Sequence, residues 1–352
     1  MGLISFDNIG ISGMSATVPQ RIISNNSFTE VFNEKEIKNA IATTGIKERR
    51  FVDSDVCSSD LCCDSANNLL DELNIDRDSV DILIFLSQTP DYAQPATAPS
   101  IQKRLGLSKK TASFDINMAC SGYIYGLSTA FAYCSSPDVK KVLLLVGETM
   151  SKAISLKDRA TCLLFGDAGS ATLIEKNEKY GKSYFSLNSD GSGNSVLKIP
   201  AGGYRVPGSP DTTQEKEYSD GSIRTDEQLY MDGMEVFNFT MRVVPKDIKE
   251  VLEFAKRTEK DIDYLVFHQA NKYMTDYLAK KSRFPINKVP YSLQKYGNTS
   301  AVTIPLTIVS ELFTGAPLNA KMLFSGFGAG LSWGSAILDL SDCHISKLNE
   351  LA

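Results

Sequence analysis

Cys120 occupies a position where a cysteine can act as a nucleophile. The stretch from Phe114 to Leu127 reads FDINMACSGYIYGL. An apolar, strand-like run ends at the cysteine, and small residues and a helix-like pattern follow it. A helix N-terminus carries partial positive charge and free backbone N–H groups, so it would stabilise a thiolate at this position. The alternative is a small core cysteine, because free cysteines are among the most buried residues.

Two further residues with suitable chemistry follow strand-like or turn-like segments. His268 comes directly after the apolar run DIDYLVF, and Asn298 lies in the turn YGNTSA. His344, the other histidine, lies in the polar stretch SDCHISK and is a poor catalytic candidate. A lone histidine at a strand end is more often structural. The similar placement of Cys120 and Asn298 favours a catalytic role for His268.

An internal repeat relates the positions of these candidate residues. VDILIF at 80–85 resembles IDYLVF at 262–267, and KKVLLLVG at 140–147 resembles AKMLFSGFG at 320–328, with offsets of 182 and 180 residues. MACSGYIYGL and YGNTSAVTIPL align loosely between them. Matched segments in one order indicate a duplication, which makes Cys120 and Asn298 counterparts facing each other across a pseudo-two-fold axis.

Each half alternates helical patterns with buried strands, which predicts an α/β fold with mainly parallel sheets. Chemistry in such folds gathers at the carboxyl ends of strands. We predict an N-terminal half over 1–175 and a C-terminal half over 233–352, with a further strand–turn–helix around Gly297. Residues 176–232 are rich in Gly, Ser, Pro and charge. This segment is predicted to be a loop-rich insertion, either a mobile loop or a cover over a substrate entrance.

Composition excludes several classes of protein. The 352 residues are 42% hydrophobic and 22% charged with a net charge of -5, so neither a nucleic-acid partner nor disorder is indicated. Seven cysteines without a CxxC pair and two histidines make a metal site unlikely in this sequence. No apolar run approaches the ~20 residues that span a membrane. We expect no membrane partner and a reducing, cytoplasmic location.

Taken together, these residues resemble the 3-oxoacyl-[acyl-carrier-protein] synthase III (ketoacyl synthase III) family of thiolase-fold condensing enzymes. The resemblance spans nearly the whole chain and rests on several motifs in the right order. They are TGIKERR at 44–50, MACSG at 118–122, LFGDAGSA at 164–171, MDGMEVF at 231–237, HQAN at 268–271, GNTSA at 297–301 and FGAGLSWGSA at 327–336.

The resemblance implies a duplicated five-layer αβαβα fold, a homodimer and no cofactor beyond coenzyme A or phosphopantetheine thioester substrates. Cys120 would accept an acyl group, and the backbone N–H groups of Cys120 and Ala329 would form its oxyanion hole. His268 and Asn298 would bind the thioester carbonyl of malonyl-acyl carrier protein and stabilise the enolate formed on decarboxylation. Attack of that carbanion on the acyl-cysteine would give 3-oxoacyl-acyl carrier protein.

The family also suggests residues for binding. Arg159, Phe165, Phe237 and Phe327 would contact substrate, although ordinary core packing explains the three phenylalanines equally well. Lys280 and Lys281 would form a basic patch for the acidic acyl carrier protein.

The sequence departs from the family where coenzyme A is held. Asn39 and Thr43 stand where a Trp and an Arg are frequent, and Tyr273 replaces an Arg after HQAN. These departures predict weaker binding of coenzyme A. They suggest an acyl donor that is carrier-bound or not the usual short acyl-coenzyme A.

Other functions account for less of the sequence. A cysteine protease also uses Cys, His and Asn but leaves the duplication unexplained. A dinucleotide-binding fold needs far more chain than follows Gly330, and a silent partner subunit is expected to lack one of the three residues. The remaining rival is an acyltransferase on the same scaffold. It would pass the acyl group from Cys120 to an alcohol or amine in secondary metabolite or polysaccharide biosynthesis, without decarboxylation.

Overall fold

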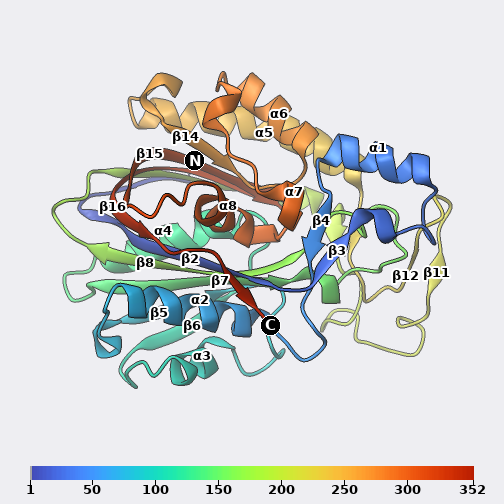
Figure 1. The fold of residues 1–352 in the computed structure, drawn as a ribbon, viewed down its shortest axis with the longest axis horizontal. Helices are drawn as coiled ribbons and strands as arrows, with labels where there is room; N and C mark the ends of the chain where they lie inside the picture. Colours follow the sequence, from blue (N-terminus) through green and yellow to red (C-terminus); the bar gives the residue numbers. More distant parts are fainter. Residues whose placement is uncertain (1) are drawn as a thin grey trace.

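Eleven strands form one continuous hydrogen-bonded system that folds into two facing layers (Figure 1). The structure, a computed structural model, describes residues 2–352. The N-terminal layer runs in the order β6 (Ala112–Ile116), β5 (Ile82–Leu86), β7 (Lys141–Thr149), β8 (Asp167–Lys176) and β2 (Ile9–Pro19). The C-terminal layer runs in the order β14 (Tyr264–Phe267), β15 (Leu318–Gly328), β16 (Ser332–Ile345), β9 (Ser183–Ser189) and β1 (Gly2–Phe6).

The two layers share a seam at their edges. The end of β16 pairs in parallel with β2, at His344 with Gly13 and at Ile345 with Met14. The last strand, β17 (Asn349–Leu351), continues along β2. The two halves of the chain are therefore joined through backbone hydrogen bonds as well as through side-chain packing.

Helices fill the space between the layers and cover both outer faces. The middle layer holds α4 (Gly122–Cys134) and α8 (Thr303–Glu311), each of which contacts strands of both halves. One outer face carries α2 (Ser58–Glu72) and α3 (Ala98–Arg104), and the other carries α5 (Gly233–Phe254) and α6 (Lys272–Lys281) (Figure 1). α4 and α8 are apolar on most sides because both of their faces are covered. The result is the predicted five-layer αβαβα arrangement.

The repeated segments occupy matching places, as the duplication predicts. β5 lies parallel to β7 in one half, and β14 lies parallel to β15 in the other. Residues Ile82 to Leu86 are all buried, because helices cover both faces of that strand. α4 and α8, which follow Cys120 and Asn298, are the matched pair of central helices.

Two predicted elements differ from the structure. Among the described residues no strand precedes Gly297; a short helix, α7 (Leu293–Tyr296), ends there instead. The segment 176–232 is not loop throughout, because β9 lies inside the C-terminal layer between β1 and β16, with Phe185 fully buried. β9 is rich in serine and also contains an asparagine, so its sequence resembles a loop, although both of its edges are hydrogen-bonded to neighbouring strands.

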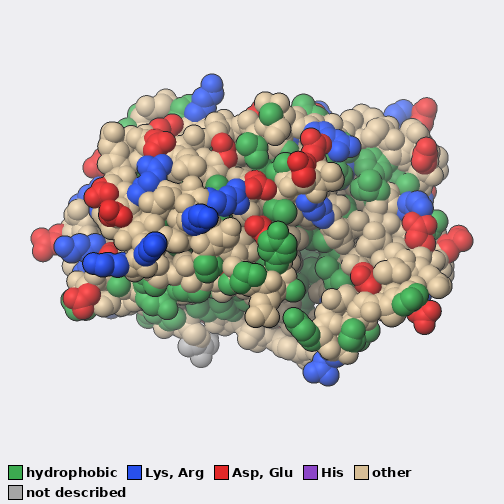
Figure 2. All heavy atoms as spheres, turned by 90° about the horizontal axis from the view of Figure 1, so that it is seen from below, with side chains coloured by type: hydrophobic (Ala, Val, Ile, Leu, Met, Phe, Trp, Pro, Cys, Tyr) green, Lys and Arg blue, Asp and Glu red, His purple; other side chains and the backbone are tan. Residues whose placement is uncertain are grey.

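The remaining elements are short and lie near one end of the layers. They are α1 (Glu34–Thr44), the pair β3 (Ile22–Ser24) and β4 (Glu48–Arg50), the pair β10 (Leu197–Lys198) and β13 (Tyr230–Met231), and the pair β11 (Lys216–Glu217) and β12 (Ile223–Arg224). Figure 2 shows one face of the molecule, on which hydrophobic side chains surround a hollow and basic and acidic side chains are interspersed. No helix within residues 2–352 is long and apolar enough to cross a membrane.

Candidate active site

Cys120 lies in the short loop between β6 and α4, at the N-terminal end of a helix buried between the two layers. The turn is closed by a hydrogen bond of 2.7 Å from the Gly122 amide to the Ala119 carbonyl oxygen. Cys120 is 5% exposed, so its thiol faces the protein interior and one cavity. The strand-to-helix position predicted from the sequence is the one observed.

The end of β15 passes directly beneath this cysteine. A Cβ atom built on Gly328 would lie 2.7 Å from the Cys120 Cβ and 3.2 Å from its Sγ, which is closer than side chains tolerate. A residue without a side chain is therefore required there. Ala329, the next residue, lines the same cavity as Cys120.

Asn298 is held by the backbone of a neighbouring loop. Its amide donates to the Leu164 carbonyl oxygen at 2.9 Å, and its own carbonyl accepts from the Gly166 amide at 3.1 Å. Gly297 before it has φ +65°, and a Cβ there would lie 2.5 Å from the Leu164 oxygen. This close approach explains why a glycine precedes the asparagine.

Ser300 connects the three predicted catalytic residues. Its Oγ lies 3.5 Å from Cys120 Sγ, its carbonyl oxygen lies 3.2 Å from His268 Nδ1, and its amide donates to Asn298 Oδ1 at 2.8 Å. Ser300 has φ +53°, an uncommon backbone conformation for a serine. The structure thus brings Cys120, His268 and Asn298 together around Ser300, a residue of the GNTSA motif whose type alone predicts no role.

Burial governs the charge of these groups. Loss of hydration raises the pKa of the Cys120 thiol to about 12, against a smaller opposing effect of the Ser300 hydroxyl. Loss of hydration also lowers the pKa of His268 to about 3, so its imidazole is neutral at physiological pH. Loss of hydration therefore opposes the resting thiolate that the helix N-terminus is expected to favour.

The imidazole of His268 is fixed by its surroundings. Nδ1 lies 2.8 Å from Thr303 Oγ1, and the ring meets Phe327 edge-on at 5.3 Å between centroids. Phe327 therefore packs against the candidate catalytic histidine and does not line the cavity beside Cys120.

A buried carboxyl group lies close behind the site. Glu148, at the end of β7, is fully buried, and its Oε2 accepts from the Thr89 hydroxyl at 3.1 Å and from the Gln88 amide at 3.4 Å. Loss of hydration raises its pKa to about 8. Sequence reasoning missed Glu148, although it follows the apolar run of KKVLLLVG and so obeys the strand-end rule that selected His268.

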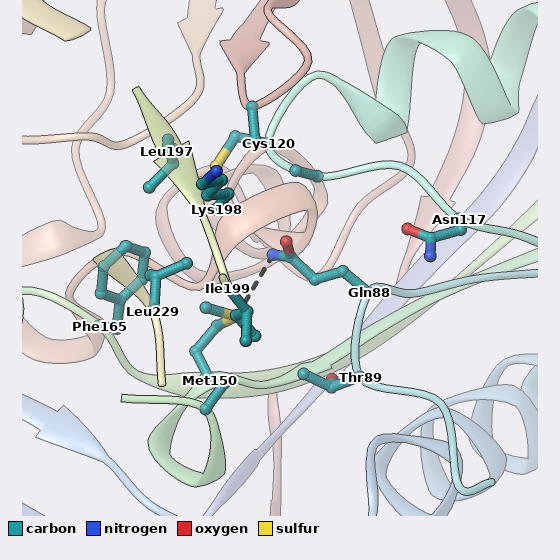
Figure 3. Close-up of a pocket in the computed structure, with 13 residues that line it drawn as sticks. Gln88, Thr89, Asn117, Cys120, Met150, Phe165, Leu197, Lys198, Ile199 and Leu229 are labelled. Atoms are coloured by element: carbon teal, nitrogen blue, oxygen red, sulfur yellow. Dashed lines mark hydrogen bonds between the residues drawn. The ribbon is translucent and has the colours of Figure 1, made fainter. Parts of the chain in front are cut away.

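A cavity of about 190 Å³ opens beside Cys120 (Figure 3). Its floor and walls combine apolar side chains with a few polar groups. The lining residues are Gln88, Thr89, Asn117, Ala119, Cys120, Met150, Ala153, Phe165, Leu197, Lys198, Ile199, Leu229 and Ala329. Four of them come from the segment 176–232, which therefore forms part of the wall of this cavity. Such a mixture suits a short acyl chain with its reacting carbonyl at the cysteine.

The other predicted binding residues lie away from this cavity. Phe237 stacks on Tyr273 with ring centroids 6.0 Å apart. Arg159 donates to Glu36 Oε1 and to the Val31 carbonyl oxygen, both at 2.6 Å. Neither Phe237 nor Arg159 lines the cavity.

Lys280 and Lys281 are exposed at the C-terminal end of α6, where a basic side chain complements the helix dipole. Within residues 2–352, no group of three or more His, Cys, Asp or Glu side chains is arranged to hold a metal ion.

Comparison with known proteins identifies the family of this chain. Residues 114–191 match the family model of 3-oxoacyl-[acyl-carrier-protein] synthase III, and residues 252–340 match the model of its C-terminal region. The chain is 40% identical over 347 residues to a putative 3-oxoacyl-[acyl-carrier-protein] synthase 3 of Campylobacter jejuni, covering 97% of both chains. It is 34% identical to the beta-ketoacyl-[acyl-carrier-protein] synthase III of Fusobacterium nucleatum, covering 94% of this chain and 98% of that one.

A solved structure shows the same fold. The 3-oxoacyl-(acyl-carrier protein) synthase of Burkholderia xenovorans LB400 superposes with a TM-score of 0.92 at 36% identity, covering 99% of both chains. The predicted thiolase-type fold is thereby confirmed. The chain belongs to the 3-oxoacyl-[acyl-carrier-protein] synthase III family, whose members are condensing enzymes of the acyltransferase class.

Proposed function

We propose that this protein acylates Cys120 from an acyl thioester and condenses that acyl group with malonyl-acyl carrier protein, giving 3-oxoacyl-acyl carrier protein and CO₂. The observation that carries the proposal is the arrangement around Ser300, which contacts Cys120, His268 and Asn298 at once. A cysteine alone supports acyl transfer. A neutral histidine and an asparagine beside it add the donors that a decarboxylation needs.

Acylation begins at the thiol. As Cys120 Sγ attacks the thioester carbonyl, negative charge develops on that oxygen. The backbone N–H groups of Cys120 and Ala329 are the proposed donors for it. Both residues border the cavity, and the absence of a side chain at Gly328 lets the two loops approach each other.

Condensation then uses the other two residues. In the tautomer that carries its hydrogen on Nε2, the neutral imidazole of His268 can donate to the malonyl thioester carbonyl. The Asn298 side-chain amide supplies a second donor. With two donors on that oxygen, loss of CO₂ leaves a stabilised enolate, and its carbon attacks the acyl-cysteine. The low pKa of His268 suits this role because a neutral imidazole donates without losing its proton.

The acyl donor is proposed to be carrier-bound. Asn39 and Thr43 lie exposed on α1, and Tyr273 lies exposed on α6, packed against Phe237. None of these three residues carries a positive charge that could bind a nucleotide phosphate. Lys280 and Lys281 are the proposed contacts for an acidic carrier protein. We also propose that the protein forms a homodimer and that it is located in the cytoplasm.

The test is intact-protein mass after incubation with matched acyl-coenzyme A and acyl-acyl carrier protein donors. The wild-type chain is compared with Cys120→Ala, and Cys57→Ala, at a partly exposed cysteine outside the cavity, is the control. We expect an adduct that disappears only with Cys120→Ala, and malonyl-dependent release of CO₂ from the acylated protein. No adduct from any donor would overturn the acyl-enzyme mechanism. An adduct from short acyl-coenzyme A at micromolar concentration would overturn the carrier-bound donor.

Simple transfer of the acyl group to an alcohol or amine is the second candidate. The names of the relatives do not favour it, because they describe ketoacyl synthases. It predicts an adduct on Cys120 without release of CO₂ from malonyl-acyl carrier protein, so the same experiment separates the two.

A further inference from the structure

We propose that the acyl group taken up by Cys120 carries a hydroxyl near its thioester end, and that the side chain of Gln88 selects it. This inference rests on the proposed function and deepens it, because it names the class of acyl group that enters the cavity. It assigns Gln88 as a specificity-determining residue, whose side-chain oxygen accepts a hydrogen bond from the substrate.

The amide group of Gln88 is held in one orientation through its nitrogen. Nε2 donates to the Ser300 hydroxyl oxygen at 2.8 Å and to the Met150 sulfur at 3.3 Å (Figure 3). A thioether sulfur can only accept a hydrogen bond, so the nitrogen of the amide, and not its oxygen, faces Met150. Both hydrogens of the amide are therefore used within the protein.

The side-chain oxygen of Gln88 is left without a partner. Oε1 accepts no hydrogen bond within residues 2–352, and it is not among the oxygen atoms that the protein buries completely. Gln88 lines the cavity beside Cys120, and Figure 3 shows its side chain reaching into that cavity from the loop after β5. The oxygen therefore offers the cavity a fixed hydrogen-bond acceptor.

This acceptor lies close to the point where the acyl group is attached. A single atom, Ser300 Oγ, links the Gln88 amide to the nucleophile, because it lies 2.8 Å from Nε2 and 3.5 Å from Cys120 Sγ. A substituent that meets Oε1 is therefore on one of the first carbons of the acyl chain and not on a distant tail.

A hydroxyl is the substituent that fits this acceptor. The oxygen of an amide can only accept, so its partner has to donate. A plain alkyl chain would separate Oε1 from water without giving it a partner, which is unfavourable. A carboxylate cannot be the partner either, because it also only accepts. A hydroxyl donates its hydrogen and is small enough for a cavity of about 190 Å³.

The other polar side chains of the cavity wall do not take this role. The Thr89 hydroxyl donates to Glu148 Oε2 at 3.1 Å and accepts from the Thr149 amide at 2.9 Å, so it is already paired. Asn117 and Lys198 are exposed, so water can satisfy them whether or not an acyl group is bound. Among residues 2–352, Lys198 is the one charged residue in the wall, which makes a carboxylate-bearing acyl group the rival class.

The experiment measures single-turnover acylation of Cys120 by acyl carrier protein loaded with butyryl, (R)-3-hydroxybutyryl, (S)-3-hydroxybutyryl or succinyl groups. These donors share a chain of four carbons and differ in the polar group. Adducts are followed by quenched flow and intact mass. The readout is the ratio of the rates for two donors in the same variant. Such a ratio cancels any loss common to all donors, including one that a change at Gln88 causes through Ser300.

Three variants are compared with the wild type. Gln88→Met has a similar length and no acceptor oxygen, whereas Gln88→Glu keeps an acceptor oxygen in either protonation state. Lys198→Met removes the charge of the rival class. Gln102→Met on α3 is the matched control. The Gln102 nitrogen is likewise bound by two acceptors, the carbonyl oxygens of Leu107 and Ser108, but it lies outside the cavity.

We expect the wild type to react about 10- to 100-fold faster with one 3-hydroxybutyryl enantiomer than with butyryl. One enantiomer should be preferred because a fixed acceptor meets the hydroxyl on one side of the chain only. Gln88→Met should lower this ratio to about 1, since neither donor then finds an acceptor. Gln88→Glu should keep most of the preference, and Gln102→Met should keep all of it. If Gln88→Met does not fold, the wild-type ratio still decides whether a hydroxyl is preferred.

Three results would overturn the inference. They are equal wild-type rates with butyryl and both hydroxybutyryl donors, a hydroxyl preference that survives in Gln88→Met, and a preference for succinyl that disappears in Lys198→Met. The last result would assign a carboxylate-bearing acyl group instead. Absence of an adduct from every donor would overturn the proposed function, so the two failures are distinguishable.

Discussion

Gly328, at the end of β15, lies against Cys120, so the two halves of the chain meet at the candidate nucleophile. A methyl group on Gly328 would sit 2.7 Å from the Cys120 Cβ. The nucleophile is therefore positioned by its own loop and also by the end of β15, which comes from the other half.

Gly328→Ala should push Cys120 out of place and reduce its acylation by at least 100-fold, because a misplaced nucleophile loses its alignment with the oxyanion donors. Acyl adducts are counted by intact mass after a fixed time. Gly233→Ala is the control, since a Cβ there would meet nothing within 4 Å. A fully acylated Gly328→Ala protein would show that the contact is dispensable.

His268→Ala and Asn298→Ala should separate the two chemical steps. Each removes one proposed donor to the malonyl carbonyl, and loss of such a donor typically costs about 10²–10³ in rate. We expect release of CO₂ to fall by that factor, while acylation of Cys120 falls much less. The measurement is ¹⁴CO₂ release beside adduct mass. Equal loss of both steps would contradict the division of roles.

Met150→Ala should lengthen the acyl chain that the enzyme accepts. Met150 lines the cavity beside Cys120, and removal of its side chain leaves space that a longer apolar tail can fill. A ladder of acyl donors from two to ten carbons, scored by adduct mass, should shift its optimum upward by two or more carbons. Met234→Ala, at a residue 68% exposed, should leave the ladder unchanged.

Stability should depend on pH through Glu148. Its pKa is raised from 4.5 to about 8, so between these values the folded protein binds more protons than the unfolded chain, and stability falls as pH rises. The Glu148→Gln variant has no carboxyl to titrate at this position, so its stability does not fall for this reason. The free energy of unfolding of the wild type relative to the variant should therefore fall by on the order of 4 kcal/mol from pH 4.5 to pH 8.

Denaturant unfolding at fixed protein concentration measures this difference. Asp247→Asn supplies the comparison, because the pKa of Asp247 is raised from 3.8 to about 6, so its effect on stability should level off by about pH 7. A Glu148 effect that also levels off by about pH 7 would mean that the carboxyl ionises well below pH 8.

The sequence predicted where the candidate site residues lie better than it predicted their pKa values. Cys120 and His268 could be found because a long apolar run marks a buried strand, and the residue after it lies at the sheet edge where sites form. Glu148 obeys the same rule, but it was overlooked because a single glutamate after such a run also fits an exposed strand end.

Features that depend on three-dimensional packing were harder to predict. The pKa of Cys120 depends on how completely the layers exclude water, which no local pattern records. Ser300 matters because its backbone turns through positive φ, and a serine gives no hint of that conformation. β9 was missed because its partners, β1 and β16, lie far away in the chain.

The pairing of β16 with β2 also bears on how the site tolerates change. Cys120 and Asn298 lie at matching places in the two pseudo-equivalent halves, so each half supplies different members of the candidate site. Backbone hydrogen bonds from β16 and β17 to β2 join these halves. A change that unfolds either half should therefore disrupt the whole site.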